Sequence, residues 1–326
     1  MMDRRTFIGS VAGGLLAAPL LGAAQQSGKV PVVGILNYSV GPRSRSVDGT
    51  RQGLLELGYV EGQTIVFEVR FAGGKPESYP GFAADLVRRK VDVVLAIGTP
   101  ALQAARDATS AIPIVAFDLE SDPVQAGFAR SFAHPGGNIT GCFLDQPGLP
   151  GKWLELIGEA VPGTHRIAVL RDPTTGPWQL AAIKAAAEKL GVELQVIEVR
   201  NPGELEQALG AVLTGGSRAL VQLSSPLFDS PGAKRIADFA ATHRVPAISM
   251  LRSFAEAGGL MSYGPNLPEY QKRLPVYIDR ILKGANPADL PIEQPTKFDF
   301  VINLKTAQAF GLTMPQSLRV QAELID

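Results

Sequence analysis

Short apolar runs alternate along the chain with longer segments that carry apolar residues at helical spacing. Runs rich in Val, Ile and Leu predict buried strands, because strands covered on both faces lose the polar alternation. Segments with apolar residues three or four positions apart predict amphipathic helices. The predicted strands are residues 30–36, 64–71, 91–97, 112–117, 139–144, 166–170, 193–199, 219–223 and 246–251. The predicted helices are residues 43–57, 77–89, 153–160, 179–190, 204–213 and 234–243, and another begins at Gly98-Thr99-Pro100.

This alternation predicts an α/β fold with parallel sheets, since strands separated by helices of about 10–15 residues form βαβ units. The pattern occurs twice, at an offset of about 130 residues. Leu57-Gly58 corresponds to Leu190-Gly191, and Ile112-Pro113 corresponds to Val245-Pro246. We therefore expect two similar Rossmann-like lobes in tandem.

The last quarter of the chain does not simply extend the second lobe. Residues 258–264 form a predicted strand with glycine near both ends, and residues 269–282 form a predicted amphipathic helix. One more strand over 298–302 and a short helix over 305–310 follow. The pattern alone leaves open which lobe these elements join.

The N-terminal residues 1–24 have the pattern of an export signal. Arg4 and Arg5 precede a charge-free stretch over 7–21, and the small residues Gly22-Ala23-Ala24 suit a signal peptidase. The apolar stretch is too short and too rich in glycine for a membrane span, which needs ~20 residues. The paired arginines resemble a twin-arginine (Tat) signal. They also occur in Sec signals, so both routes stay open.

Composition excludes several classes of protein. The 326 residues hold 31 Lys and Arg against 31 Asp and Glu, so the cationic surplus of a nucleic-acid binder is missing. A hydrophobic content of 45% excludes a disordered chain. Cys142 is the single cysteine, which excludes a disulfide scaffold, and its distance from the signal excludes a lipid anchor. We expect a soluble, free protein of a Gram-negative periplasm.

No catalytic constellation is visible. The histidines His134, His165 and His243 are scattered, and no phosphate loop, nucleophile elbow or dinucleotide fingerprint is present. Cys142 is interpreted as a small buried hydrophobe, with a nucleophile as the alternative. The acidic residues Asp118, Glu120 and Asp122 are the best metal candidate, and a solvated loop is the competing interpretation. We expect no enzyme, no catalytic residue, no metal and no cofactor.

Small polar residues follow the predicted strands, where ligands bind in parallel α/β sheets. Helix N-termini at these turns present free N–H groups that suit a carboxylate. Gly98-Thr99 is the sharpest candidate, with Thr99 binding a carboxylate and an acid such as Asp122 binding an α-amino group. The candidate ligand-binding residues at these turns are Asn37, Ser39, Gly98, Thr99, Ser121, Asp122, Asp172, Ser224, Ser225 and Arg252.

Several longer segments resemble a known family. They are residues 53–63, 92–100, 122–124, 135–141, 258–264, 294–298 and 303–307. Together they resemble the ABC transporter substrate-binding proteins of the type I periplasmic-binding fold, in the group that includes tryptophan- and tyrosine-binding members. The resemblance covers nearly the whole chain after the signal. It is specific for the family and does not identify one ligand.

The resemblance implies two lobes with parallel sheets, joined by a three-strand hinge, that clamp a small solute between them. It implies an N-terminal lobe of residues 28–146 plus 265–299 and a C-terminal lobe of residues 147–264 plus 300–326. It adds Tyr263, near a crossover, to the candidate ligand-binding residues. The implied ligand is an amino acid or other small carboxylate. The implied partners are an inner-membrane ABC permease and its ATPase, with the binding protein a monomer and no nucleic acid bound.

The family leaves alternatives open. Arg171-Asp172 stands where relatives often carry an uncharged residue and Asn, which puts an aromatic amino acid in doubt as the ligand. A periplasmic sensor subunit of the same fold is the first alternative function. An exported α/β enzyme is the second, and the lack of a catalytic constellation argues against it. A transcription regulator is disfavoured, because it would carry a DNA-binding module in place of an export signal.

Overall fold

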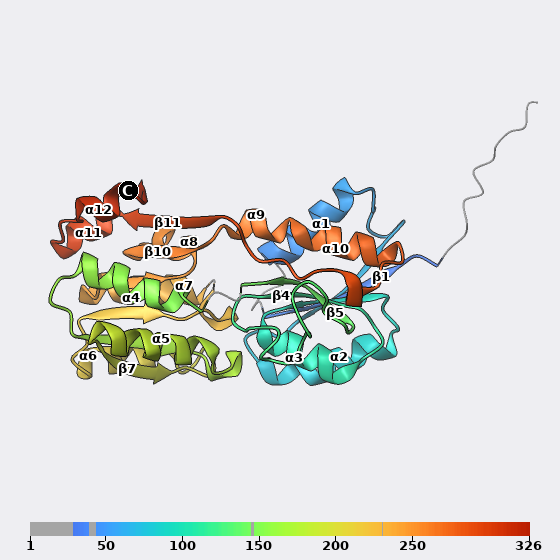
Figure 1. Ribbon diagram of the computed structural model, residues 1–326, viewed down its shortest axis with the longest axis horizontal. Coiled ribbons are helices and arrows are strands. Elements are labelled where there is room, and N and C mark those ends of the chain that lie inside the picture. Colours follow the sequence, from blue (N-terminus) through green and yellow to red (C-terminus); the bar gives the residue numbers. More distant parts are fainter. Residues whose placement is uncertain (1–28, 39–43, 145–146, 230) are drawn as a thin grey trace, which may run out of the picture. The chain divides into compact units, whose positions relative to one another are not determined.

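The computed structural model describes residues 29–38, 44–144, 147–229 and 231–326. The predicted export signal lies outside these residues and stays a prediction. Residues Pro31–Asp326 form one unit that contains two α/β sheets, each covered by helices (Figure 1). The prediction of two α/β lobes is therefore confirmed.

The first lobe is a five-stranded parallel sheet with helices on both faces. Its strands are β1 (Val32–Asn37), β2 (Val66–Phe71), β3 (Val93–Ile97), β4 (Ile114–Asp118) and β5 (Ile139–Phe143), and its helices include α1 (Arg45–Glu56), α2 (Tyr79–Arg88), α3 (Thr99–Ala108) and α10 (Arg273–Leu282). The strand order is β2-β1-β3-β4-β5. Successive strand residues such as Leu95 and Ala96 enter opposite apolar clusters, one with α1 and α10 and the other with α2 and α3. Because both faces are covered, the strands are apolar throughout.

The second lobe repeats this plan and extends it. Its strands are β6 (Arg166–Arg171), β7 (Glu193–Glu198), β8 (Ala219–Gln222), β9 (Ala247–Ser249), β10 (Met261–Pro265), β11 (Phe298–Asn303) and β12 (Glu323–Ile325). Its helices include α4 (Leu149–Ala160), α5 (Trp178–Leu190), α6 (Leu205–Thr214), α7 (Gly232–His243), α8 (Arg252–Glu256), α11 (Leu304–Phe310) and α12 (Gln316–Arg319). The order β7-β6-β8-β9-β10 matches β2-β1-β3-β4-β5 strand for strand. The predicted internal repeat is confirmed.

The chain passes between the two sheets three times. After β5 it enters the second lobe at α4, and after β10 it returns to the first lobe through α9 (Leu267–Gln271) and α10. It then re-enters the second sheet as β11, which pairs antiparallel with β10. This pair is the antiparallel exception in sheets that are otherwise parallel, as expected. The chain leaves along β10 and comes back along β11 in the opposite direction, so the two strands can only pair antiparallel.

Helix 269–282 was predicted as one element and is divided in two. Residue Lys272 separates α9 from α10. Pro275 lacks an N–H, so the carbonyl of Gln271 has no intrahelical donor four residues later. Strand β12 and helices α8 and α12 were not predicted, because three to five residues carry too little periodicity to register.

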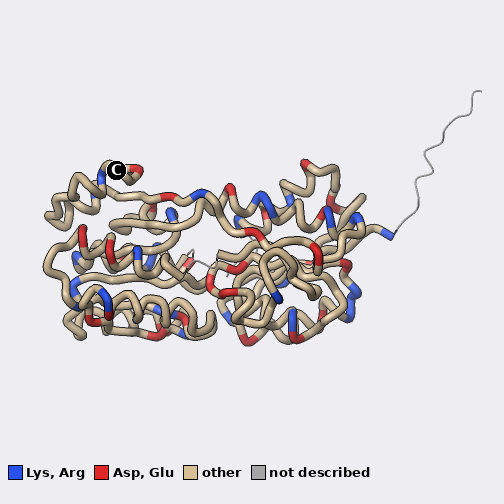
Figure 2. Tube along the Cα trace, viewed as in Figure 1, with Lys and Arg blue, Asp and Glu red and all other residues tan. Residues whose placement is uncertain are grey.

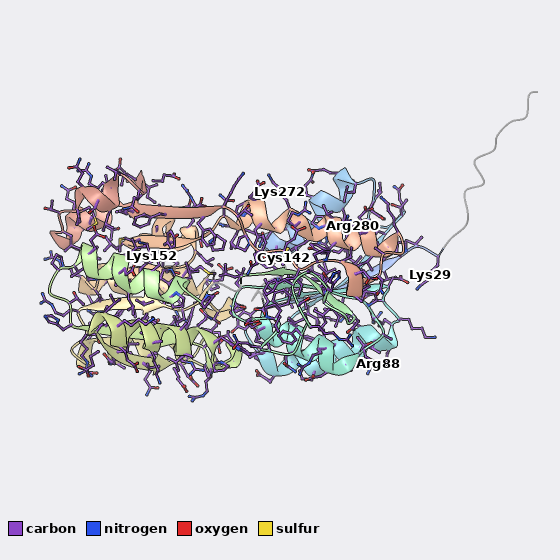
Figure 3. The ribbon with its side chains drawn as sticks, viewed as in Figure 1. Lys29, Arg88, Cys142, Lys152, Lys272 and Arg280 are labelled. Atoms are coloured by element: carbon purple, nitrogen blue, oxygen red, sulfur yellow. The ribbon has the colours of Figure 1, made fainter. Side chains whose placement is uncertain are left out.

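Cys142 lies on β5 inside the first lobe (Figure 3). It is a free, buried cysteine, and burial raises the pKa of its thiol. Acidic and basic residues are interspersed along the trace of both lobes, as the balanced composition suggests (Figure 2). Within the described residues, every helix is too short or too polar to cross a bilayer.

Candidate functional site

Polar side chains from the strand ends of both lobes meet in one buried cluster. Thr99 follows β3, while Asp118 ends β4 and is followed by Glu120 and Ser121, all in the first lobe. Ser224 follows β8 in the second lobe, and its Oγ donates to Glu120 Oε1 over 2.8 Å. All five side chains are buried. Three of the predicted residues, Thr99, Ser121 and Ser224, are thus brought together at the boundary between the lobes.

Asp118 is the centre of the first-lobe part of this cluster. Its Oδ1 accepts hydrogen bonds from Thr99 Oγ1 over 2.8 Å and from the Glu120 backbone amide over 3.0 Å. Its Oδ2 accepts from Ser121 Oγ over 2.5 Å. Both oxygens of this buried carboxyl are thus satisfied by hydrogen bonds. The β3 and β4 ends are thereby held together by side chains as well as by the sheet.

Glu120 is the member of the cluster that faces the other lobe. Only 5% of the residue is exposed. Its Oε2 lies 3.4 Å from Thr99 Oγ1, in addition to the Ser224 bond. Burial raises the pKa of this carboxyl well above its usual range, and the nearby charge of Asp118 raises it further. Two adjacent carboxyls in a buried site cannot both ionise without a large electrostatic cost.

A second polar group forms within the second lobe. Ser225 Oγ donates to Asp172 Oδ2 over 2.6 Å. The Thr174 amide and hydroxyl donate to Asp172 Oδ1 over 2.8 and 2.7 Å. Asp172 thus caps the short helix η2 (Pro173–Thr175) and fixes the turn after β8 at the same time. The side-chain amide of Gln179 binds the backbone of Ser224. The Ser224 N–H donates to Gln179 Oε1 over 2.8 Å, and Gln179 Nε2 donates to the Ser224 carbonyl over 2.9 Å.

Gly98 lies where a side chain of the second lobe comes close to the backbone of the first. Its φ is +87°, in the region that favours glycine. A Cβ at this position would lie 2.7 Å from Cγ of Pro226, which follows β8 in the second lobe. Gly98 therefore serves two needs, a left-handed backbone and room for the opposite lobe.

Tyr38, directly after β1, connects the first lobe to the apolar core of the second. The apolar cluster that includes Tyr38 otherwise consists of second-lobe residues, among them Leu170 and Leu227. Its hydroxyl donates to the Gly74 carbonyl over 3.2 Å. Burial raises the pKa of this phenol, with a further contribution from Asp172. The ring anchors one lobe in the other.

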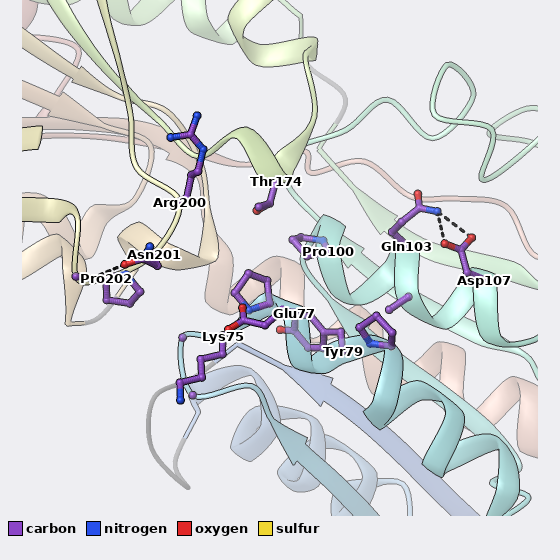
Figure 4. Close-up of a pocket in the computed structure, with 16 residues that line it drawn as sticks. Lys75, Glu77, Tyr79, Pro100, Gln103, Asp107, Thr174, Arg200, Asn201 and Pro202 are labelled. Atoms are coloured by element: carbon purple, nitrogen blue, oxygen red, sulfur yellow. Dashed lines mark hydrogen bonds between the residues drawn. The ribbon is translucent and has the colours of Figure 1, made fainter.

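A cavity of about 910 Å³ opens between the lobes (Figure 4). Its lining includes Pro100, which directly follows Thr99, but none of the five residues of the cluster. Its volume is within the range of small-molecule sites. Tyr79, at the start of α2, lines the cavity and is 1% exposed. Within the described residues its phenol oxygen has no hydrogen-bond partner. The labelled lining residues are Lys75, Glu77, Tyr79, Pro100, Gln103, Asp107, Thr174, Arg200, Asn201 and Pro202.

The remaining predicted residues lie outside this cluster. Asn37 donates to Ser44 Oγ over 3.0 Å, and Asp122 Oδ1 accepts from the amides of Val124 and Gln125. Ser39 lies outside the described residues. Two further predicted residues have partners in the second lobe: Arg252 pairs with Glu323 and Glu256, and Tyr263 contacts the rings of Phe298 and Phe300.

Sequence reasoning missed Tyr38 and Tyr79 as candidates. Asn37 and Ser39 were chosen for their polarity, whereas the residue between them makes the contact with the other lobe. The two glycines after β2, Gly73 and Gly74, could have drawn attention to Tyr79. They begin the loop that lines the cavity and leads to this residue. In the described part of the chain, no group of three or more His, Cys, Asp or Glu side chains is arranged to hold a metal ion.

Comparisons with known proteins agree with this geometry. Residues 29–325 match the family model described as ABC transporter substrate binding protein. The chain is similar to a conserved domain protein of Vibrio cholerae, with 26% identity, a TM-score of 0.82, and coverage of 91% of this chain and 100% of that one. It is equally similar in sequence to an ABC domain in complex with L-Trp from Streptococcus pneumoniae, with 26% identity, a TM-score of 0.80 and the same coverage.

A curated relative is also similar. The tyrosine-binding protein of Clostridioides difficile is 24% identical over 274 residues, which cover 82% of this chain and 78% of the relative. The family model spans almost every residue of both lobes, and the solved structures share their fold. The chain therefore belongs to the family of ABC transporter substrate-binding proteins and has the type I periplasmic-binding fold.

Proposed function

We propose that this protein captures an amino acid between its lobes and delivers it to an ABC importer. The observation that carries the proposal is the buried polar cluster shared by both lobes. A cavity of about 910 Å³, whose lining includes Pro100 directly after Thr99, also takes residues from both lobes. A ligand can favour closure only by binding the closed form better than the open one. Groups from both lobes at one site supply that difference.

The ligand class is an amino acid with an aromatic side chain. The relatives named for tyrosine and bound to L-Trp support this choice. The carboxyls of Asp118 and Glu120 attract an ammonium group. Thr99 gives its one hydroxyl hydrogen to Asp118, and a ligand carboxylate beside two carboxyls would be repelled. We therefore place the ammonium, and not the carboxylate, next to Thr99, and we assign the acidic role to Glu120 in place of Asp122.

The ligand carboxylate and ring belong on the cavity side. The phenol of Tyr79 is a buried hydrogen-bond donor that the described chain leaves unused. Pro100 and Ala104 of the first lobe and Pro202 of the second contribute apolar surface to the lining of the same cavity. A dissociation constant near 1 μM corresponds to about −8 kcal/mol, which a few charge-assisted hydrogen bonds and one apolar contact can supply.

Binding of L-tyrosine and L-tryptophan tests the function directly. We expect at least one of them to raise the unfolding temperature of the chain without residues 1–24, because a ligand specific for the native state stabilises it by mass action. Calorimetry should give a micromolar dissociation constant, and Glu120→Ala should weaken it by about 1–3 kcal/mol. Succinate, which lacks an ammonium group, is the control. Equal binding of succinate, or binding of none of the three, would contradict the proposal.

The setting of this function follows the sequence. We propose that residues 1–24 direct export, through the Tat route, and that the mature monomer is free in the periplasm. Its partners are an inner-membrane permease and the associated ATPase, and it is not an enzyme. The moving bodies are residues 28–146 plus 265–299 and residues 147–264 plus 300–326, which swing about the three crossovers near 147, 264 and 300.

A further inference from the structure

Two neighbouring carboxyls at the lobe boundary raise the question of where a proton resides. Asp118 has three donors, from Thr99, Ser121 and the Glu120 amide. Glu120 accepts a hydrogen bond from Ser224 Oγ of the opposite lobe over 2.8 Å, and the Thr99 backbone is a second donor to it. Hydrogen bonds to the charged form favour ionisation. The two carboxyls lie 2.8 and 3.4 Å from the same Thr99 hydroxyl, and burial raises the pKa of Glu120, so we assign a shared proton to Glu120.

The hydrogen count at Thr99 leads to the same assignment. Its hydroxyl lies 2.8 Å from Asp118 Oδ1 and 3.4 Å from Glu120 Oε2. A hydroxyl has one hydrogen, and the shorter contact takes it. The oxygen of Thr99 can then accept a hydrogen from a protonated Glu120. When Glu120 is protonated, its carboxyl hydrogen can be donated across the 3.4 Å contact to Thr99 Oγ1, whose hydroxyl hydrogen is already given to Asp118.

Tyr79 links this pair to the cavity. It lines the cavity from α2, it is 1% exposed, and its phenol oxygen has no partner within the described residues. The charge of Glu120 contributes to raising the pKa of this phenol, after burial and the neighbouring Tyr38. A buried donor without a partner, which lines the cavity and lies within electrostatic reach of Glu120, indicates that a polar ligand group completes the site.

We propose that Glu120 holds a proton in the ligand-free closed protein and that the ammonium group of the ligand replaces this proton on binding. The inference rests on the proposed function. The carboxylic acid of Glu120 loses its proton to solvent and forms an ion pair with the incoming R–NH3⁺, so charge and atoms balance. The titratable groups acting on Glu120 are Asp118 at the end of β4 and Tyr79 on α2.

The lobes provide the path for this exchange. Opening breaks the bond from Ser224 to Glu120, because the two residues belong to different lobes. The carboxyl then faces the cleft and the ligand ammonium can reach it. The raised pKa of Glu120, caused first by burial and then by Asp118, supports a neutral acid in the closed form. Because a proton leaves, ligand affinity should rise with pH until Glu120 is ionised in the free protein.

The proton on Glu120 can be detected without a ligand. Infrared difference spectra of the ligand-free protein near neutral pH should contain the C=O stretch of a protonated carboxylic acid. This band should be missing in Glu120→Gln and retained in Glu188→Gln, an exposed glutamate on α5. If the wild-type protein has no such band, or if Glu120→Gln keeps it, the inference is overturned, whether or not the protein binds amino acids.

The exchange is measured by calorimetry with L-tyrosine and L-tryptophan. Titrations at one pH in buffers of different ionisation enthalpy should give a proton release approaching one per bound ligand in the wild-type protein and in Glu188→Gln. Glu120→Gln should release none. Binding without proton release in the wild-type protein contradicts the exchange and leaves the proposed function standing. If neither amino acid binds, the proposed function and the exchange are rejected together, and the infrared band alone decides the state of Glu120.

Discussion

At the scale of single residues, the boundary between the lobes depends on side chains that satisfy one another and on one residue without a side chain. Asp118 collects donors from Thr99 and Ser121. Gly98 leaves space for Pro226 of the other lobe. The hydrogen bonds of Asp118 fix the first-lobe side of the site, and the missing side chain of Gly98 permits the second lobe to close on it.

Gly98→Ala should therefore impair both folding and closure. The residue has a φ of +87°, and its new Cβ would meet Pro226 at 2.7 Å. We expect a loss of about 1–2 kcal/mol in the free energy of unfolding, measured with denaturant, and weaker ligand binding. The double variant Gly98→Ala with Pro226→Ala should recover binding but not stability, because only the contact is relieved.

A matched control is Gly81→Ala on α2. This glycine has no atom within 4 Å of a built Cβ, and its φ is not positive. Alanine favours a helix over glycine by up to about 1 kcal/mol, so this variant should be as stable as the wild-type protein or more so. Equal behaviour of the two variants would contradict the role given to Gly98.

At the scale of elements, charged side chains tie β2 to α2 on the surface of the first lobe. Arg70 on β2 pairs with Asp85 on α2 over 2.6 Å, and Arg89 contacts the same carboxylate over 3.1 Å. The hydrogen bond from Arg70 is the largest cause that lowers the pKa of Asp85 to about 2. The pair lies on the side of the lobe that carries Tyr79, at the other end of α2.

This pKa gives the stability of the protein an acid-sensitive component. In the unfolded chain the pKa of an Asp side chain is ~3.9, which is above the pKa of Asp85 in the folded protein. The stabilisation by Asp85 is therefore present above about pH 4 and is lost as the pH falls toward 2. Asp85→Asn should lower stability near neutral pH and remove this part of the decline in acid, as followed by thermal unfolding across pH. Asp238→Asn on α7, which removes only an exposed pair with Lys234, should lower stability near neutral pH much less than Asp85→Asn does.

At the scale of the whole molecule, the two lobes are joined by the three chain crossings and by side-chain contacts at their boundary. Tyr38 enters the apolar cluster of the second lobe, and Ser224 binds Glu120 of the first. The hydrogen bond between Glu120 and Ser224 needs both lobes to be in contact. Because Glu120 is also proposed to bind the ligand, the free energies of lobe closure and of ligand binding are linked. The amount of ligand-free closed protein sets the apparent affinity.

Tyr38→Ala should shift the protein toward the open form. Loss of a buried aromatic ring removes apolar contact that exists only when the lobes meet. Small-angle X-ray scattering of the ligand-free protein should give a larger radius of gyration than the wild type, and ligand should bind more weakly. Tyr38→Phe should remain closed.

Tyr59→Ala is the matched control for this effect. Tyr59 binds Asp279 within the first lobe, so its loss should reduce stability without changing the radius of gyration. An unchanged radius in Tyr38→Ala, or an equal increase in both variants, would argue against Tyr38 as the anchor between the lobes.

The sequence alone determined the elements and their order. Apolar runs for strands covered on both faces and helical periodicity between them are local signals, so the two parallel sheets and the internal repeat were predictable. The strand-end rule also located Thr99, Ser121 and Ser224, because every parallel sheet presents these ends at one edge. The break at Lys272 had its signal in Pro275, although the helical periodicity on both sides concealed it.

The tertiary structure alone decided which residues meet. Glu120 and Ser224 are 104 positions apart, and neither carries a local signal for the other. The antiparallel pairing of β10 with β11 follows from the path of the chain through the other lobe, which no local pattern records. The roles of Tyr38, Tyr79 and the Asp118–Glu120 pair depend on burial between two lobes. Burial is a property of the assembled fold. It places loop residues that have no local signal where they interact strongly with one another.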